Sequence, residues 1–242
     1  MLTTFPIEQF KMLQTDAQNY KDPMSLLKAF PALRIKPDYV LRLYYHYSHG
    51  DGIGAVWAFR NEDAPPENWF IDDEEIDEEI FRGGTCDIEN LKERGMLKPG
   101  NRCKTLKEVF QKPDGALDDF MEAIEGDGTP WSYLSASLFA REAPELGASW
   151  HGCSWSARMI FGKDPDELRR AGDSPFQWLV PKPKMWLPSC QDEGDTVIVQ
   201  FYSHTLLEGE RVIQHRDVYQ KGSYVSRYEG QDIATGDGFM IF

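Results

Sequence analysis

Segments with the composition of β-strands follow one another in the last third of the chain, separated by short turns. Thr196–Thr205, Arg211–Tyr219 and Ser223–Tyr228 are rich in β-branched and aromatic residues, and Glu208-Gly209 and Lys221-Gly222 lie between them. Two-residue turns of this kind join strands that are antiparallel neighbours. The C-terminal third is therefore predicted to form an antiparallel meander.

A second strand pattern occurs near the N-terminus. Tyr39–Tyr47 and Ile53–Phe59 flank Gly50-Asp51-Gly52, a sequence typical of a hairpin turn. The first 35 residues and the stretch from about residue 72 to 142 show short amphipathic helical patterns instead, and the last of these begins at Thr129-Pro130.

No alternation of strands and helices is present, which argues against a doubly wound nucleotide-binding fold. The predicted class is α+β, with an antiparallel β-sheet built from residues ~38–59 and ~150–242, an N-terminal helical segment and a helical insertion at ~72–142. We expect a single domain over residues 1–242, with the insertion as a candidate sub-domain.

The charge of the chain limits its partners. The net charge is −14, and seven of the eight residues in Asp72–Glu79 are acidic, so removing these seven charges leaves −7. Basic residues are scattered, whereas nucleic-acid and membrane surfaces need clustered Lys and Arg. We therefore expect neither nucleic acid nor a membrane as a partner.

The sequence also bears on the compartment of the protein and on the state of its cysteines. No uncharged stretch approaches the ~20 residues that a membrane-spanning helix needs, and Met1–Gln14 lacks the pattern of a secretory signal. A soluble, cytoplasmic protein with reduced cysteines is expected. The spacing of the cysteines excludes a zinc site built from CxxC pairs; they are Cys86, Cys103, Cys153 and Cys190.

Register arithmetic on the meander provides the main functional hypothesis. If both turns have two residues, Tyr202 lies opposite His215 and His204 lies opposite Ile213. One face would then gather polar and aromatic side chains. The candidate catalytic residues on it are His204, His215 and Asp217, and the candidate ligand-binding residues are Tyr202, Tyr219, Tyr224 and Tyr228.

The first hairpin adds a similar face. Arg42, Tyr44 and His46 share one side of their strand. If the two β sections form one sheet, both faces line one concavity suited to an aromatic or polar small molecule. The other interpretation is structural: Tyr and His lie half-buried under a covering helix, with their polar atoms hydrogen-bonded.

Two short motifs resemble parts of enzyme sites. His49-Gly50-Asp51 is similar to the HxD of the iron/2-oxoglutarate oxygenase superfamily, which implies a further distant His as an iron ligand. Glu208-Gly209-Glu210 resembles the ExE of arginine-directed ADP-ribosyltransferases, with Arg42 as the strand arginine. A hairpin turn explains the first motif equally well, and a solvated turn explains the second.

Two hypotheses of different class result. The first is a small-molecule binder or enzyme that uses the Tyr/His face, with metal-dependent oxygenase chemistry through His49-Gly50-Asp51 as a variant. The second is an acidic interaction module of the inhibitor or immunity type, in which the Asp72–Glu79 helix binds a basic protein partner. The residues identify no cofactor, and no metal site is assigned.

Overall fold

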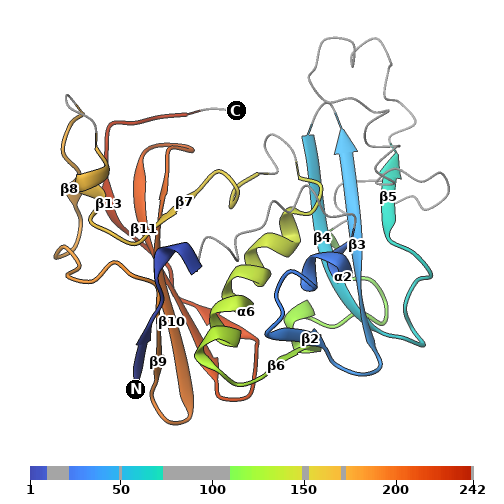
Figure 1. The fold of residues 1–242 in the computed structure, drawn as a ribbon. Coiled ribbons are helices and arrows are strands. Elements are labelled where there is room, and N and C mark those ends of the chain that lie inside the picture. Colours follow the sequence, from blue (N-terminus) through green and yellow to red (C-terminus); the bar gives the residue numbers. More distant parts are fainter. Residues whose placement is uncertain (10–21, 49–50, 73–109, 149–152, 170–172, 241–242) are drawn as a thin grey trace. The chain divides into compact units, whose positions relative to one another are not determined.

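A computed structural model describes residues 1–9, 22–48, 51–72, 110–148, 153–169 and 173–240 (Figure 1). The chain divides into two compact units. Unit 1 comprises Met1–Gln14, Gly126–Leu138 and Ser154–Phe242, and unit 2 comprises Thr15–Glu125 and Phe139–Cys153. The boundary falls inside helix α6 (Pro130–Glu142). The expectation of a single domain stays a prediction.

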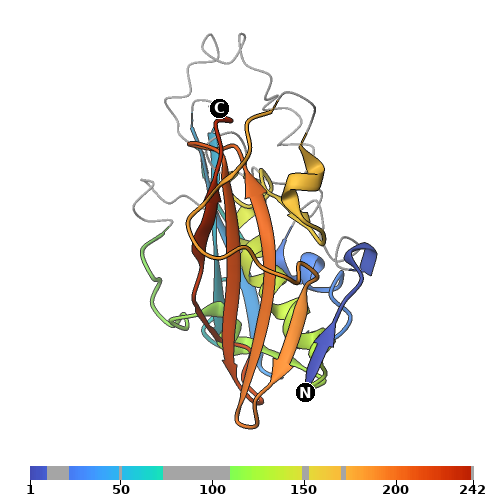
Figure 2. The same ribbon diagram turned by 90° about the vertical axis from the view of Figure 1, so that its left-hand side faces the viewer.

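Unit 1 is built on an eight-stranded antiparallel sheet, which confirms the α+β class. Its main path runs β1-β9-β10-β11-β13-β8, while β12 pairs with β11 and β7 pairs with β10. The strands are β1 (Leu2–Thr4), β7 (Met159–Phe161), β8 (Gln177–Trp178), β9 (Ser189–Asp192), β10 (Thr196–Thr205), β11 (Arg211–Gln220), β12 (Ser226–Tyr228) and β13 (Gln231–Thr235). Figure 2 shows β9, β10, β11 and β13 side by side.

At the central strands β10 and β11, both faces of the sheet are covered by other parts of the protein. Seven of the ten residues of β10 are buried, as expected for a strand covered on both sides. Val199 and Phe201 are fully buried on one face, and Tyr202 on the other belongs to an aromatic cluster. The buried members of that cluster are Phe161, Phe176, Trp186, Tyr202, Val212, Ile233 and Ala234.

The register of the β10–β11 hairpin differs by one residue from the sequence prediction. His215 lies opposite Phe201, and Tyr202 lies opposite Gln214. The turn is longer than two residues because backbone groups of the turn form hydrogen bonds with the C-terminal segment instead of with each other. The Glu210 N–H donates to the Gly238 carbonyl, and the Met240 N–H donates to the Leu206 carbonyl. A shift by one residue reverses which face each side chain occupies.

Helix α6 begins where the sequence predicts. Asp127 accepts hydrogen bonds from the Thr129 N–H and hydroxyl, and Pro130 occupies the first helical position. The first part of the helix packs on the sheet of unit 1, where the Tyr133 ring lies 5.3 Å from the Tyr219 ring. Two hydrogen bonds between hydroxyl groups hold this packing: the Tyr219 hydroxyl pairs with the Ser137 hydroxyl, and the Tyr224 hydroxyl pairs with the Ser132 hydroxyl.

Unit 2 contains the predicted N-terminal hairpin in a separate sheet. Its strands are β3 (Tyr39–Ser48) and β4 (Asp51–Arg60), and β5 (Trp69–Asp72) pairs with β3 in parallel. A two-stranded sheet joins β2 (Leu33–Ile35) to β6 (Ile124–Gly126). The two β sections therefore lie in separate sheets, so the condition for one shared concavity is not met.

The core of unit 2 joins the hairpin to distant segments. The buried Tyr45 hydroxyl donates to the Gly147 carbonyl at 2.9 Å. Phe139 packs edge-on against Phe30 and Phe120. Helices in the described part of unit 2 include α2 (Pro23–Leu27), capped by Asp22, and the 3-10 helices η2 (Phe120–Ala123) and η3 (Ala143–Glu145).

Several predicted elements differ in detail. Leu2–Thr4 is a strand rather than part of an N-terminal helix, because it adds to the edge of the sheet beside β9. The composition of Trp150–Phe161 and Lys184–Leu187 predicts a strand in each segment. In the described part of the first segment only β7 (Met159–Phe161) is a strand, and the second segment has bends at Lys184 and Leu187 ahead of β9. Most of the predicted helical insertion, residues 73–109, lies outside the described residues.

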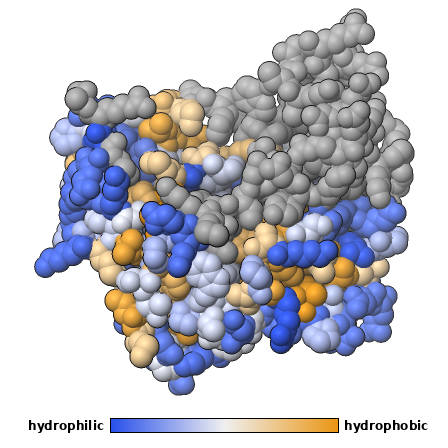
Figure 3. All heavy atoms as spheres, in the orientation of Figure 1, coloured by the Kyte–Doolittle hydropathy of each residue, from blue (hydrophilic) through white to orange (hydrophobic). Residues whose placement is uncertain are grey.

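Figure 3 shows one face of the described parts, which carries both polar and apolar side chains. On the face shown in Figure 3, polar and apolar residues alternate over short distances. Among the described residues, no helix is both long enough and apolar enough to cross a membrane.

Candidate functional site

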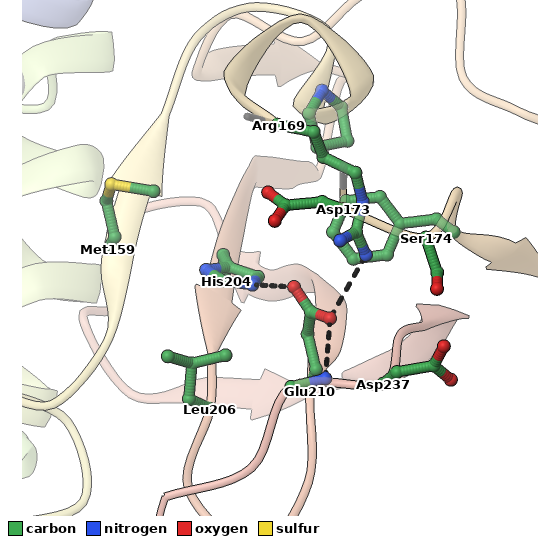
Figure 4. A pocket seen from close by; sticks show the side chains of 11 residues that line it. Met159, Arg169, Asp173, Ser174, His204, Leu206, Glu210 and Asp237 are labelled. Carbon is green, nitrogen blue, oxygen red and sulfur yellow. Dashed lines mark hydrogen bonds and ion pairs between the residues drawn. The ribbon is translucent and has the colours of Figure 1, made fainter. Parts of the chain in front are cut away.

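A pocket of about 570 Å³ opens in unit 1 at the end of the sheet where β10 turns into β11. This volume is within the usual range for small-molecule sites. Its lining combines ionisable and apolar side chains (Figure 4). The residues are Met159, Pro165, Arg169, Asp173, Ser174, Phe176, His204, Leu206, Glu210, Asp237 and Gly238.

Glu210 is the centre of a hydrogen-bonded network in this pocket. Its Oε1 lies 3.0 Å from His204 Nε2, and its Oε2 accepts from Arg169 Nη2 and from the Gly238 N–H, each at 3.0 Å. The Glu210 side chain is only 8% exposed. The sequence predicts that both glutamates of this turn are solvated. The prediction is wrong for Glu210, which is buried, whereas Glu208 is exposed.

The hydrogen bonds favour the ionised form of this carboxylate. Burial raises the pKa of Glu210, but the bonds from Gly238, His204 and Arg169, together with the charge of Arg169, outweigh burial and lower the pKa overall. An ionised carboxylate only accepts hydrogen bonds. Glu210 therefore requires a donor from each of its three partners.

This requirement fixes the tautomer of His204. Nε2 must carry a hydrogen to donate to Glu210, so in the neutral ring Nδ1 holds the lone pair. Within the described part of the chain, Nδ1 has no hydrogen-bond partner. The His204 side chain is 19% exposed and lines the pocket. Its second nitrogen is thus an acceptor that no described residue uses.

Arg169 and the C-terminal segment hold the network from two sides. The Arg169 guanidinium rests over the Phe176 ring, 3.7 Å from its centroid, and Phe176 also packs edge-on against His204. Gly236 permits this arrangement, because a Cβ there would collide with the Glu210 carboxylate and with Arg169 Nη2. The Gly236–Gly238 segment therefore forms a wall of the pocket.

His215 lies on the opposite face of the sheet from His204. It is buried, with Ser203 Oγ at 2.7 Å from Nε2 and the Tyr228 hydroxyl at 3.0 Å from Nδ1. Asp217 is buried on the same face. The one-residue shift separates both of these residues from His204, so the three predicted catalytic residues do not share a site. Their catalytic roles stay predictions.

The predicted ligand-binding tyrosines also divide between the two faces. Tyr202 is buried in the aromatic cluster on the face of His204, where its hydroxyl accepts from Gln200. Tyr219 and Tyr224 anchor helix α6 through their hydroxyls. Tyr228 is half exposed and packs on His215. These contacts agree with the structural interpretation of the aromatic residues.

The hairpin residues belong to unit 2 and do not extend this pocket. Arg42 Nε donates to the Pro65 carbonyl at 2.8 Å, and burial lowers the pKa of Arg42 despite the opposing charge of Asp22. Tyr44 is buried against Phe59, and His46 is half-buried. A ligand-binding role for these residues stays a prediction.

Sequence reasoning identified His204 but missed its partners. Arg169, Phe176, Glu210 and Asp237 come from separate loops and strand ends. The sequence shows Glu210 only within the Glu208-Gly209-Glu210 motif, and Asp237 only as a member of a glycine-flanked turn. No spacing rule relates residues 169, 204, 210 and 238, because the fold alone brings them together.

The remaining sequence hypotheses fall mostly outside the described residues. His49 and Gly50, and Asp73–Glu79 of the acidic segment, lie there, so neither the oxygenase motif nor the interaction helix is described. Over the described ranges, no group of three or more His, Cys, Asp or Glu side chains is arranged to hold a metal.

Comparison with known proteins gives no relative. No protein-family model matches the chain, and neither a curated protein nor a solved structure shows significant similarity to it. Functional inference therefore rests on the site itself.

Proposed function

We propose that this protein binds a small polar organic molecule in the pocket around His204, with His204 Nδ1 accepting a hydrogen bond or a proton from it. The observation that carries this proposal is the 3.0 Å contact of His204 Nε2 with the buried Glu210 carboxylate. A carboxylate that orients one imidazole nitrogen and leaves the other at a cavity is the arrangement of many general bases.

The pocket wall supports the same proposal. Met159 and Leu206 lie on one side of the Glu210 carboxylate, and Ser174 and Asp237 lie on the other (Figure 4). A ligand would thus meet apolar surface and polar groups together, as is usual in small-molecule sites. Such ligands gain affinity from the apolar contact and orientation from the few polar groups.

A fragment screen on the full chain tests the proposal. We expect saturable chemical-shift changes at the His204 ring nitrogens and at the Gly238 amide. Met159 lies directly opposite His204 in the β7–β10 pair and is 49% exposed, so Met159→Trp should fold while obstructing the pocket. Because overpacking an occupied site costs about 1–3 kcal/mol, binding should weaken by roughly tenfold or more.

The matched control is Met185→Trp. Met185 is also an exposed methionine, but it does not line the pocket. It should leave the affinities unchanged. Fragments that bind both Trp variants as tightly as the wild type would show that the pocket is not the binding site. The same conclusion would follow if fragments shift only resonances remote from His204.

A further inference from the structure

We propose that the ligand of this pocket is a small organic cation, an amine with an apolar body. This inference rests on the proposed function and identifies the class of ligand. It follows from the charges and hydrogen-bonding groups that the pocket leaves available once its own side chains are paired.

The positive charge of the pocket is compensated within the protein. Arg169 Nη2 lies 3.0 Å from Glu210 Oε2, and the two side chains are 14% and 8% exposed. One face of the guanidinium is also covered by Phe176. Because the pair is shielded and close, each charge cancels most of the field of the other at the position of a ligand. Arg169 is thereby a poor attractor for an anion.

The negative charge of the pocket is not fully compensated. Asp237 lies on the pocket wall between Gly236 and Gly238, and its carboxylate has no ion-pair partner among the described residues. The Asp237 carboxylate would repel an anionic ligand at close range and attract a cation.

The hydrogen-bonding groups favour the same class. His204 Nδ1 accepts, because the Glu210 bond commits the ring hydrogen to Nε2. The Asp237 carboxylate also only accepts. Each of these acceptors favours a ligand with N–H or O–H donors, and an ammonium group supplies several donors together with the charge complementary to Asp237. Met159 and Leu206 would contact its apolar part.

Three probes of similar size and different charge test the class: butylamine, butanol and butyrate, titrated into the full chain at neutral pH. Binding is followed by the shifts of the His204 ring nitrogens and the Gly238 amide. We expect butylamine to bind most tightly and butyrate least. Asp237→Asn should weaken butylamine binding by roughly fivefold, the effect of one partly exposed ion pair, and should weaken butanol binding by a smaller factor because no charge pair is lost.

Asp114→Asn is the control, since it removes the same charge from an exposed residue of unit 2 that does not line the pocket. Tighter binding of butyrate than of butylamine would overturn the cation class and leave the proposed function standing. Equal butylamine affinity in Asp237→Asn and Asp114→Asn would overturn the role of Asp237. If none of the probes shifts His204 or Gly238, the proposed function fails together with this inference.

Discussion

Glu210→Ala should lower the free energy of unfolding by about 3 kcal/mol, because removing one member of a buried charge pair leaves the other uncompensated. Arg169, 14% exposed, would lose its counter-charge, and the Gly238 N–H would lose its acceptor. His204 would lose the group that orients it. Urea unfolding followed by circular dichroism measures the change.

Glu208→Ala is the control for this prediction. It removes a glutamate from the same turn, but Glu208 is exposed, so we expect a change below about 0.5 kcal/mol. Equal losses in the two variants would show that the Glu210 network contributes no particular stability.

The stabilisation by Glu210 should also depend on pH. Burial raises the pKa of this carboxyl, but its hydrogen bonds outweigh burial and lower it below the ordinary value of 4.5. The contribution is therefore complete above pH 4.5 and decreases as the pH falls through the lower folded-state pKa. The stability difference between wild type and Glu210→Ala should narrow over that acidic interval.

Tyr133→Ala should destabilise unit 1 by about 3–5 kcal/mol, the usual cost of deleting a buried aromatic ring. Tyr133 is 1% exposed, and its ring lies 5.3 Å from Tyr219 and 5.0 Å from Tyr224. Its hydroxyl accepts from the Gly222 N–H at 2.8 Å. The variant removes the contacts that hold the first part of α6 against the sheet.

Tyr133→Phe separates the ring from the hydroxyl. It keeps the ring contacts and loses one hydrogen bond, so we expect a loss of about 1 kcal/mol. Thermal and urea unfolding of both variants provide the comparison. A loss below about 1.5 kcal/mol for Tyr133→Ala would contradict the packing of α6 on this face.

The parts of the fold that local sequence determines were predictable. Tyr39–Tyr47 and Ile53–Phe59 predict the first hairpin, because their β-branched and aromatic residues favour strands on either side of a turn. The start of α6 is equally local, since Thr129-Pro130 is sufficient to indicate it. The limits of β10 follow the prediction without change.

The register of the β10–β11 hairpin was not predictable in this way. Glu208 and Gly209 both have positive φ, as a two-residue turn would require. The additional loop residues are fixed by backbone hydrogen bonds with the Gly238 carbonyl and the Met240 N–H, which lie about thirty positions further along the chain. A local rule cannot include them, and the resulting one-residue shift divides the predicted Tyr/His face.

The candidate site shows the same limit. His204 could be selected because an imidazole on a strand is a common acid–base group. Glu210 was noticed only as part of the Glu208-Gly209-Glu210 motif, and its burial could not be expected, because a glutamate in a glycine-containing turn is ordinarily solvated. It is buried here through its contacts with Arg169 and Gly238. The polar residues that the sequence grouped together instead serve packing, as Tyr219 and Tyr224 do beneath α6.

The most direct test of the account is the tautomer of His204, read from long-range ¹H–¹⁵N NMR spectra of the full chain above neutral pH. We expect the Nε2-protonated form with unprotonated Nδ1, because Nε2 donates to Glu210. In Glu210→Gln this preference should weaken. A His204 that carries its hydrogen on Nδ1, or a tautomer balance unchanged by Glu210→Gln, would contradict the proposed acceptor and the site built on it.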